Sequence, residues 1–179
     1  MSEADYDKPE EVHWTGKFIV AKTRGKWEYV SRTRGIKAAV ILAIDAEDHV
    51  ILVEQFRVPL GRPCIEFPAG LIGDHGEAED ATAAAARELE EETGYRAARM
   101  ENLGEYYSSP GMVTESFTLL RAHGLTQVGP GGGVDGENIT VHRVPRRELA
   151  TFIAESRARG LGIDVRLLML LGPGMIGEE

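Results

Sequence analysis

The chain of 179 residues contains a single cysteine, Cys64, and therefore has no partner with which to form an internal disulfide bond. It also lacks an apolar run of the roughly 20 residues that a helix needs to cross a bilayer. The first residues, MSEADYDKPEEVHW, are too acidic and polar for a secretory or transit leader. We therefore expect a protein of the reducing cytoplasm with no membrane partner, and Cys64, inside the apolar stretch CIEF, is expected in the core.

Positive charge is scarce as well. The chain has 20 lysines and arginines against 29 aspartates and glutamates, a net charge of −9. No stripe of Lys and Arg stands out, which argues against a nucleic acid as partner. An acidic protein can still bind a phosphorylated small molecule if metal ions and a few local arginines supply positive charge. The composition thus excludes some partners without naming one.

The hydrophobic pattern predicts an α+β protein with few helices. Residues 11–33 indicate two short strands around the turn TRGK. Residues 36–45 and 49–58 indicate a hairpin, and residues 64–73 indicate one more strand that ends in a Pro/Gly bend. Further along, the pattern predicts a helix over 78–93, strands near 99–107, 116–122 and 139–144, and helices over 146–160 and 164–171. We divide the chain into an N-terminal β extension, residues 1–35, and a main domain, residues 36–179.

The end of the first predicted helix, RELEEETGY, holds four glutamates in five positions: Glu88, Glu90, Glu91 and Glu92. Such a cluster is unfavourable, because like charges repel across one turn and a helix C-terminus already carries partial negative charge. Glu88, Glu91 and Glu92 can project into one small volume, where a hard divalent cation with oxygen ligands would neutralise them. Arg87 is placed to hold Glu91 by an i,i+4 pair. Taken alone, the cluster is also compatible with a solvated acidic face.

The residues around this cluster follow a fixed spacing. Gly73 is followed after five residues by Glu79, after seven more by Arg87-Glu88-Leu89, and then by Glu91-Glu92 and Gly94-Tyr95, each after one residue. This pattern resembles the Nudix hydrolase box without a departure. In that family the box is a loop–helix–loop that binds magnesium or manganese and hydrolyses a nucleoside diphosphate linked to another group. The resemblance implies a Nudix-type α/β/α sandwich with a mixed sheet, in which Glu88, Glu91 and Glu92 are metal ligands.

Sequences outside the box resemble the ADP-ribose pyrophosphatase branch of that family. They are EQFRVPLGRPCIEFPAGLI before the box, Pro110 sixteen residues after Gly94, the N-terminal GKWEYVSR and the C-terminal GIDVRLLMLL, so that the similarity covers residues 14 to 172. It implies hydrolysis of ADP-ribose to AMP and ribose 5-phosphate with two or three Mg²⁺ ions, or Mn²⁺ in their place. It also implies a homodimer in which the N-terminal strands of one subunit complete the site of the other.

The resemblance assigns substrate-binding roles to six residues: Phe18, Trp27, Glu28, Arg32, Arg57 and Leu71. Trp27 would stack on adenine, with Phe18 as a second wall, and Glu28 would accept from the adenine amino group. Arg32 and Arg57 would pair with phosphate oxygens, to which the guanidinium fork is suited. The backbone carbonyl of Ala69 would be a further metal ligand. Each of these aromatic residues, taken singly, is also a typical core residue, and an arginine in a strand is usually only solvated.

The general base is left open between three carboxylates. The branch takes it from a loop after the box, here GPGGGVDGENI, in which Glu137 matches best and Asp135 second; Glu115 in MVTES is the third candidate. Five glycines between 129 and 136 suggest the flexibility of a closing loop. With Glu137 as base, Glu91 and Glu92 complete the predicted catalytic set. A solvated acidic loop is the alternative interpretation.

Two other functions remain compatible with the sequence. The same chemistry could act on another nucleoside diphosphate sugar, such as GDP-mannose or ADP-glucose. A non-catalytic sensor of ADP-ribose is less favoured, because this chain keeps every residue of the box. An isoprenoid diphosphate isomerase lacks support, because the catalytic cysteine expected of that enzyme has no counterpart here. Cys64 precedes the box and lies in a predicted strand.

Overall fold

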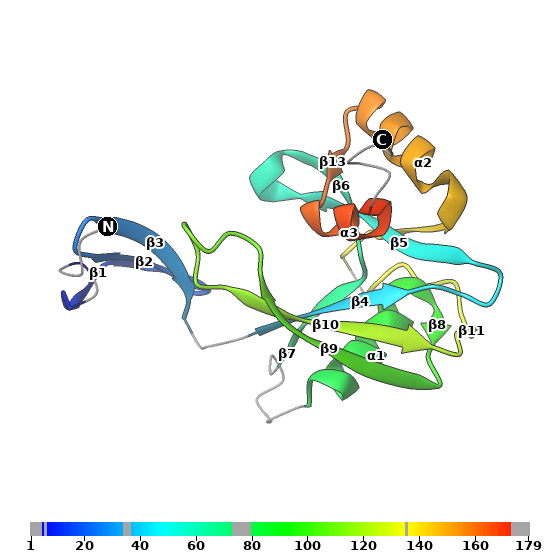
Figure 1. Ribbon diagram of the computed structural model, residues 1–179, viewed down its shortest axis with the longest axis horizontal. Helices are drawn as coiled ribbons and strands as arrows, with labels where there is room; N and C mark the ends of the chain where they lie inside the picture. Colours follow the sequence, from blue (N-terminus) through cyan, green and yellow to red (C-terminus); the bar gives the residue numbers. More distant parts are fainter. Residues whose placement is uncertain (1–4, 6, 34–36, 73–79, 135, 173–179) are drawn as a thin grey trace.

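The N-terminal part of the protein forms a sheet of its own. The computed structural model describes residues 5, 7–33, 37–72, 80–134 and 136–172. Strands β1 (Glu10–Thr15), β2 (Ile19–Arg24) and β3 (Trp27–Arg32) form an antiparallel sheet in the order β1-β2-β3. Figure 1 shows this sheet at one end of the molecule, beyond the tips of β9 and β10.

Two four-stranded sheets make up the centre of the remaining chain. One has the order β7-β4-β10-β9 and the other β12-β5-β6-β13, and a small third sheet pairs β11 with β8. The strands are β4 (Lys37–Ala43), β5 (His49–Arg57), β6 (Arg62–Glu66), β7 (Ala69–Ile72), β8 (Tyr95–Arg96), β9 (Arg99–Tyr107), β10 (Ser116–His123), β11 (Thr126–Gln127), β12 (Thr140–Pro145) and β13 (Gly162–Ile163).

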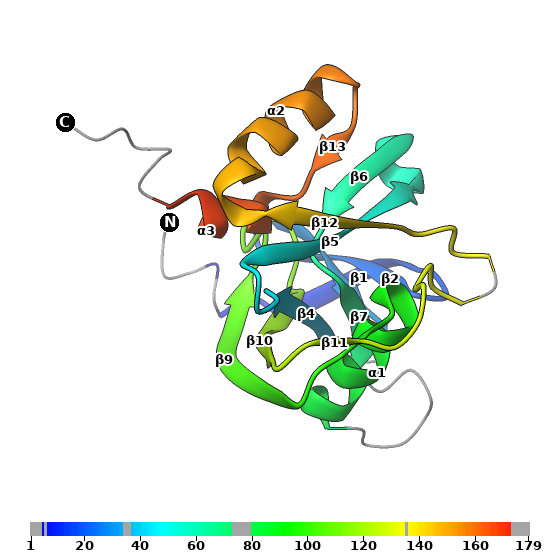
Figure 2. The ribbon, with the colours of Figure 1, turned by 90° about the vertical axis from the view of Figure 1, so that its right-hand side faces the viewer.

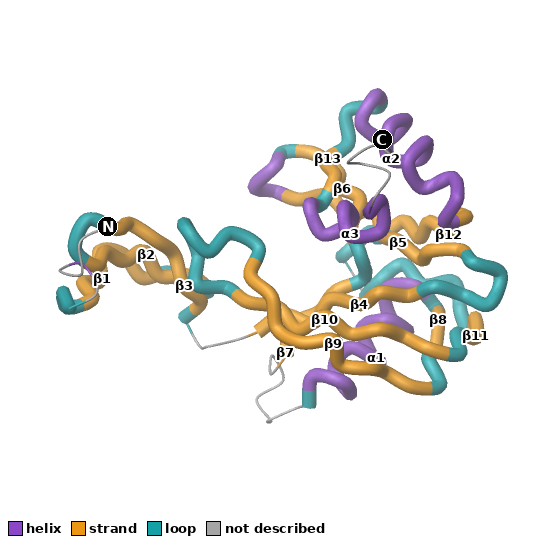
Figure 3. Tube along the Cα trace, viewed as in Figure 1, coloured by secondary structure: helices purple, strands orange, loops and turns teal. Residues whose placement is uncertain are grey.

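Helices cover the sheets from two sides. They are α1 (Ala81–Thr93), α2 (Leu149–Ala158) and α3 (Leu168–Leu171), with 3₁₀ turns at Val58–Leu60, Arg146–Glu148 and Val165–Leu167. Figures 1 and 2 place α1 on one side of the sheets and α2 and α3 on the other, and Figure 3 shows how much of the chain is strand. This confirms the predicted α+β sandwich. No helix in the described ranges has the length and apolarity needed to cross a bilayer.

Alternation along β4 explains why both faces of its sheet are covered. Ala39, Ile41 and Ala43 pack with Leu89 of α1, whereas Val40 packs with Leu149 of α2. Successive side chains of a strand point to opposite faces, so a continuous apolar strand needs a layer on each side. Cys64 is buried in the neighbouring sheet, as expected. The sandwich therefore follows from strands that are apolar throughout.

The helix of the predicted metal cluster is well defined at both ends. Asp80 caps its start by accepting a hydrogen bond from the backbone N–H of Thr82 at 3.2 Å. Gly94 ends it in the left-handed conformation, with φ of 73° and its N–H donating to the Glu90 carbonyl. The helix predicted over 78–93 is thus confirmed, while residues 78 and 79 lie outside the described residues.

The hairpin predicted from residues 36–45 and 49–58 is wrong. A turn is present, and a single antiparallel bridge joins Ile44 to Val50, but β4 and β5 then enter different sheets. Strand β4 is flanked by β7 and β10, and β5 by β6 and β12. Because a strand has only two hydrogen-bonding edges, distant segments have taken the edges that a hairpin would use.

Two other strand predictions also need correction. The stretch CIEFPAGLIG forms two strands rather than one: β6 pairs with β5, the chain bends at Phe67-Pro68, and β7 pairs with β4. Proline has no N–H to donate, and the carbonyl of Pro68 instead accepts from Ile41 at 2.9 Å. Near the N-terminus there are three strands rather than two, because residues 16–18 form a further turn between β1 and β2.

Candidate active site

A cavity of about 810 Å³ lies beside the end of α1, where the two four-stranded sheets diverge. Its lining includes eight residues singled out from the sequence: Arg32, Arg57, Ala69, Leu71, Glu88, Glu92, Glu115 and Glu137. These come from six separate parts of the chain: β3, β5, β7, α1 and the segments that precede β10 and β12. The fold therefore brings most of the predicted site residues into one place.

One wall of this cavity, the paired wall, consists of three arginines that each hold a carboxylate. Arg57 donates from Nε and Nη2 to the two oxygens of Glu66 at 2.7 and 2.8 Å, and the Glu66 side chain is only 5% exposed. This contact raises the pKa of Arg57, mainly through its hydrogen bonds to Glu66. The other two pairs are Arg32 with Glu115 and Arg166 with Asp164, each with an Nε to carboxylate distance of 2.7 Å.

A second group of lining residues, the carboxylate wall, consists of Glu88, Glu92 and Glu137. Glu88 packs against β7, where a Cβ on Gly70 would come within 2.0 Å of its Cγ, so a larger residue at this position would displace the Glu88 side chain. Glu92 accepts a hydrogen bond from the backbone N–H of Ala69 at 3.0 Å. None of the three arginines of the paired wall contacts these carboxylates within ion-pair distance.

The pKa values of two glutamates of the carboxylate wall are raised. Burial, and then repulsion from Glu88 and Glu137, raises the pKa of Glu92 to about 8, although the Ala69 N–H opposes the shift. Burial also raises the pKa of Glu88, and Glu91 and Glu137 add to it against the pull of Arg87. Buried carboxylates of like charge are typical of a site completed by a cation or a proton.

The four glutamates of RELEEETGY have separate surroundings. Glu91 pairs with Arg87 at 3.0 Å, as the i,i+4 spacing predicted, and it is not among the residues that line the cavity. Glu90 points to the surface, where Arg96 holds it with two hydrogen bonds of 2.8 Å. Glu88 and Glu92 alone of the four face the cavity. The acidic residues of the helix therefore lie on different faces, and two of them line the cavity.

A divalent cation fits this carboxylate wall by its chemistry. Oxygen ligands of hard cations are carboxylates and backbone carbonyls, and the cavity lining holds the buried Glu92 with Glu88 and Glu137, the pKa values of Glu88 and Glu92 being raised. In the described part of the chain, no three His, Cys, Asp or Glu side chains already stand in a geometry that would hold an ion. Binding would therefore require side-chain adjustment, above all at Glu91.

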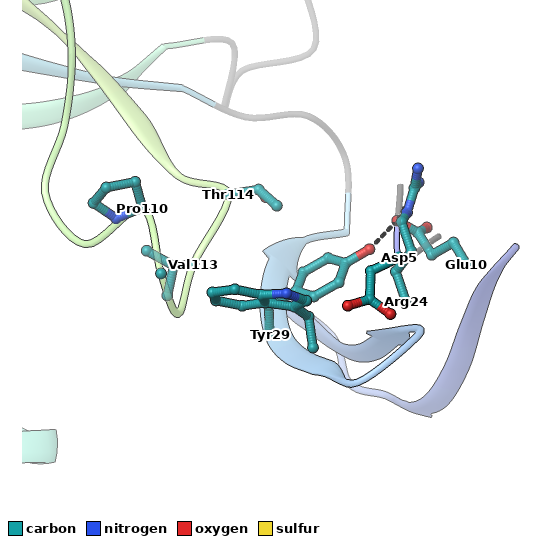
Figure 4. A pocket seen from close by; sticks show the side chains of 9 residues that line it. Asp5, Glu10, Arg24, Tyr29, Pro110, Val113 and Thr114 are labelled. Carbon is teal, nitrogen blue, oxygen red and sulfur yellow. Dashed lines mark hydrogen bonds and ion pairs between the residues drawn. The ribbon is translucent and has the colours of Figure 1, made fainter. Parts of the chain in front are cut away.

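The residues predicted to contact adenine lie elsewhere. Trp27 is 41% exposed and lines a second cavity, of about 470 Å³, between the N-terminal sheet and residues 110–114. Figure 4 shows this cavity, with Tyr29 and Arg24 on one side and Pro110 and Val113 on the other. Strand β3 is attached there by backbone hydrogen bonds between Val30 and both Met112 and Thr114.

Glu28 and Phe18 are also separated from the metal cluster. Glu28 lines a third hollow, together with Tyr29 and Met112, and Phe18 is 59% exposed and lines none of these three cavities. Within one chain, the structure therefore does not bring the predicted adenine contacts to the cavity of Glu92. Asp135 and the box residues Gly73 and Glu79 lie outside the described residues.

Sequence reasoning missed three residues of the paired wall: Glu66, Asp164 and Arg166. Glu66 lies in the apolar stretch CIEF, where a charged residue is a signal because a buried charge needs a partner. Asp164 and Arg166 belong to GIDVRLLMLL, which the sequence analysis used only as a resemblance. Asp164 and Arg166 are only two residues apart in the sequence, but their position in the cavity could not be predicted from it.

The fold and the charged cavity define a class: an α+β protein in which carboxylates and arginines line one cavity. Comparison with known proteins agrees, and the chain belongs to the Nudix family, whose NUDIX domain matches residues 33–159. It is 42% identical over 89 residues to the ADP-ribose pyrophosphatase of Bacillus subtilis, a match to 50% of this chain and 46% of that protein. It is 36% identical over 146 residues to the GDP-mannose pyrophosphatase of Cronobacter sakazakii, covering 77% of this chain and 72% of that one.

A solved structure shares the whole architecture. The crystal structure of an ADP compounds hydrolase superposes with a TM-score of 0.68, at 23% identity, over 94% of this chain and 92% of that chain. At that level of identity the likeness concerns the fold. Family and fold thus agree that the protein is a Nudix hydrolase.

Proposed function

We propose that this Nudix hydrolase cleaves the diphosphate of ADP-ribose with water and releases AMP and ribose 5-phosphate. One observation carries the proposal: three carboxylates, of which Glu92 is buried, line the same cavity as three arginines. A diphosphate carries negative charge that arginines can bind, and cations held by the carboxylates can neutralise the rest. The similarity to a protein named ADP-ribose pyrophosphatase supports the choice of nucleotide.

Two or three Mg²⁺ ions, with Mn²⁺ as the alternative, would be held by Glu88, Glu91, Glu92 and the carbonyl of Ala69. When bound, such ions polarise the phosphoryl group and help to activate water. Glu92 already lies next to Ala69, since it accepts the backbone N–H of that residue. Glu91 would have to exchange its 3.0 Å contact with Arg87 for the ions.

Glu137 is the residue that we assign as general base. Its carboxylate lines the cavity with Glu88 and Glu92, and its Oε2 accepts a hydrogen bond from the Val134 N–H at 2.9 Å. A base there would take a proton from the water that attacks phosphorus. Glu115 is a weaker candidate, because Arg32 holds its carboxylate at 2.7 Å. Asp135 lies outside the described residues.

The substrate's charge would be received by Arg32 and Arg57. Both line the cavity, and both now donate to carboxylates that a diphosphate could replace in part. Leu71 lines the same cavity and would be an apolar contact for the sugar. Bidentate guanidinium contacts to phosphate are charge-assisted and so give both affinity and orientation.

Residues 1–35 would serve as an extension for dimerisation and adenosine binding, with residues 36–179 as the hydrolase domain. Trp27, Glu28 and Phe18 lie apart from the carboxylate wall of their own chain, so an exchange of N-terminal strands would bring them to the site of a partner. Val12 and Trp14 of β1 are more than half exposed, which leaves apolar surface for such a contact.

The dimer can be tested by light scattering after gel filtration, together with activity. We expect one species of two chains, and Trp27→Ala should raise KM for ADP-ribose about tenfold with kcat little changed, since an aromatic–base stack contributes about 1–3 kcal/mol. A monomer with full activity would contradict the exchange of strands.

The single free thiol of Cys64 is consistent with our proposal that the protein works in the cytoplasm.

A second substrate class also has support. The match to a protein named GDP-mannose pyrophosphatase covers more of this chain than the match to the ADP-ribose pyrophosphatase. The metal and arginine contacts concern only the diphosphate, so they serve either nucleotide. The base and the sugar must therefore decide between GDP-mannose, ADP-glucose and ADP-ribose.

A substrate panel with purified protein and Mg²⁺ would test the proposal. We expect the highest kcat/KM for ADP-ribose, and hydrolysis in ¹⁸O-labelled water should place the label in AMP or in ribose 5-phosphate, which identifies the attacked phosphorus. A preference for GDP-mannose would shift the assignment to the second class. Binding of ADP-ribose without turnover would favour a sensor instead.

A further inference from the structure

The glycine-rich segment before β12 is attached to the end of α1. Gly132 N–H donates to the Glu92 carbonyl at 2.9 Å, and Gly133 N–H donates to the Glu91 carbonyl at 3.0 Å. These carbonyls belong to the last turn of the helix, which has no partners of its own within the helix. Figure 2 shows the chain between β11 and β12 passing beside the end of α1. The segment thus caps the helix that carries the carboxylate wall.

This contact requires glycine for steric reasons. At Gly131, where φ is 68°, a Cβ would come within 2.4 Å of the Thr93 carbonyl carbon and 2.7 Å of the Glu92 carbonyl oxygen. These are backbone atoms, which cannot move aside as the end of a flexible side chain can. The glycines here therefore permit close approach, which is a different use from the flexibility that their number suggested.

The same segment also holds the side chain of Glu137. Val134 N–H donates to Glu137 Oε2 at 2.9 Å, and Ile139 N–H donates back to the Gly132 carbonyl at 3.1 Å. A Cβ on Gly133 would lie 2.4 Å from that Glu137 oxygen. A continuous set of backbone contacts therefore connects Glu91 and Glu92 with the carboxylate of Glu137.

We propose that Gly131, Gly132 and Gly133 are positioning residues that set Glu137 against Glu88 and Glu92 before any ligand binds. The inference rests on the proposed role of Glu137 as general base and adds how it is placed. The helix end and the base segment form one unit, so backbone hydrogen bonds would hold the carboxylate of Glu137 in place relative to the glutamates that would bind the ions. A displacement of about 1 Å in such a unit can cost up to about 100-fold in rate.

The test compares Gly131→Ala with Gly129→Ala. The first places a methyl group against the α1 backbone, whereas a Cβ on Gly129 meets no atom within 4 Å and its φ is not in the left-handed region. We expect Gly131→Ala to lower kcat for ADP-ribose about 10- to 100-fold with KM within about twofold, and Gly129→Ala to leave both nearly unchanged. Equal kcat in the two variants would overturn the inference.

A double-mutant cycle separates positioning from a general loss of structure. If Gly131 acts through Glu137, adding Gly131→Ala to Glu137→Gln should change kcat by less than about twofold. An equal loss in both backgrounds would mean that the substitution acts elsewhere, and would also overturn the inference. A Glu137→Gln variant with normal kcat would instead refute the assignment of the base.

Hydrogen exchange of the wild-type protein gives a measurement that needs neither activity nor a variant. If the unit is formed in the free protein, the amides of Gly132 and Gly133 should exchange as slowly as those in the last turn of α1. Exchange at the rate of an unstructured loop would show that the unit does not exist before binding, even if Gly131→Ala proved unable to fold.

Discussion

The two walls of the cavity treat charge in opposite ways. On the paired wall, Arg32, Arg57 and Arg166 are each neutralised by a carboxylate within 2.7 Å. On the carboxylate wall, Glu92 is buried and Glu88 is partly buried, and burial together with the nearby charge of Glu137 raises the pKa values of both. A paired wall is stable by itself, whereas a wall of like charges is stable only with a proton or a cation. The difference supports the proposal that a cation binds at the carboxylate wall.

The sharpest way to break this comparison is Glu92→Gln, which removes one charge from the carboxylate wall and keeps its shape. We expect activity to fall by more than the roughly 10- to 100-fold loss typical of groups that only orient a metal ligand, with the fold intact by circular dichroism.

Glu90→Gln is the matched control, because Glu90 lies on the same helix but faces solvent and pairs with Arg96. Its kcat/KM should equal that of the wild type. Near-normal turnover of Glu92→Gln would refute the metal site, and a comparable loss in Glu90→Gln would show that the helix as a whole, rather than its cavity face, is sensitive.

A second prediction concerns the paired wall. Glu66→Gln weakens the bidentate contact that orients Arg57, so KM for ADP-ribose should rise about tenfold with a smaller effect on kcat. The free energy of unfolding should fall by about 1–3 kcal/mol, because Glu66 is buried and accepts charged hydrogen bonds. Steady-state kinetics and urea denaturation measure the two effects.

Glu101→Gln offers a control for this substitution. Glu101 also pairs with a basic residue, His123, but it lies on β9 with a side chain that is 42% exposed, and it lines neither wall. Unchanged KM in Glu101→Gln and in Glu66→Gln alike would mean that Arg57 needs no positioning by a carboxylate.

The smallest effect is a dependence of stability on pH. In the metal-free protein, Glu92 has a pKa of about 8 against an ordinary glutamate value of 4.5, so the folded state binds more protons than the unfolded state between these values. The free energy of unfolding should therefore fall as pH rises from 5.5 to 7.5, by at most about 1.4 kcal/mol per pH unit from this group. Glu88 acts in the same direction.

Denaturation of the metal-free protein at both pH values checks the slope, and Glu92→Gln should remove most of it. Added Mg²⁺ should stabilise the protein more at pH 7.5 than at pH 5.5, because cations bind the deprotonated carboxylates. Stability that rises with pH over this range without metal would contradict the burial of a charged cluster.

Local features of this protein were predictable from its residues. The alanine-rich run, the Asp80 cap and the Gly94 end specify α1 through contacts within one or two turns, and the spacing of its glutamates follows from 3.6 residues per turn. The two C-terminal helices and the strands near 99–107 and 116–122 were also predicted, because their hydrophobic pattern follows the period of a helix or of a strand. Short-range geometry is encoded where it occurs, so reading it needs no knowledge of the partner.

Contacts between distant segments were not predictable in the same way. The apolar pattern of residues 36–45 and 49–58 is equally compatible with a hairpin and with two separate sheets, because it records burial and not the neighbouring strand. Arg32 and Glu115 are 83 residues apart, and neither carries a local sign of the other. The glycines at 131–133 suggested freedom, although a close approach to α1 is what uses their missing side chains.

The sequence by itself therefore determined that Glu88 and Glu92 lie together, because carboxylates one turn apart on a helix share a face. Which charges are neutralised was settled only when distant segments of the chain met, since an ion pair depends on distance in space and not along the chain. The glutamate cluster could therefore be recognised from the sequence. The paired wall and the backbone contacts that hold Glu137 could be recognised only from the tertiary structure.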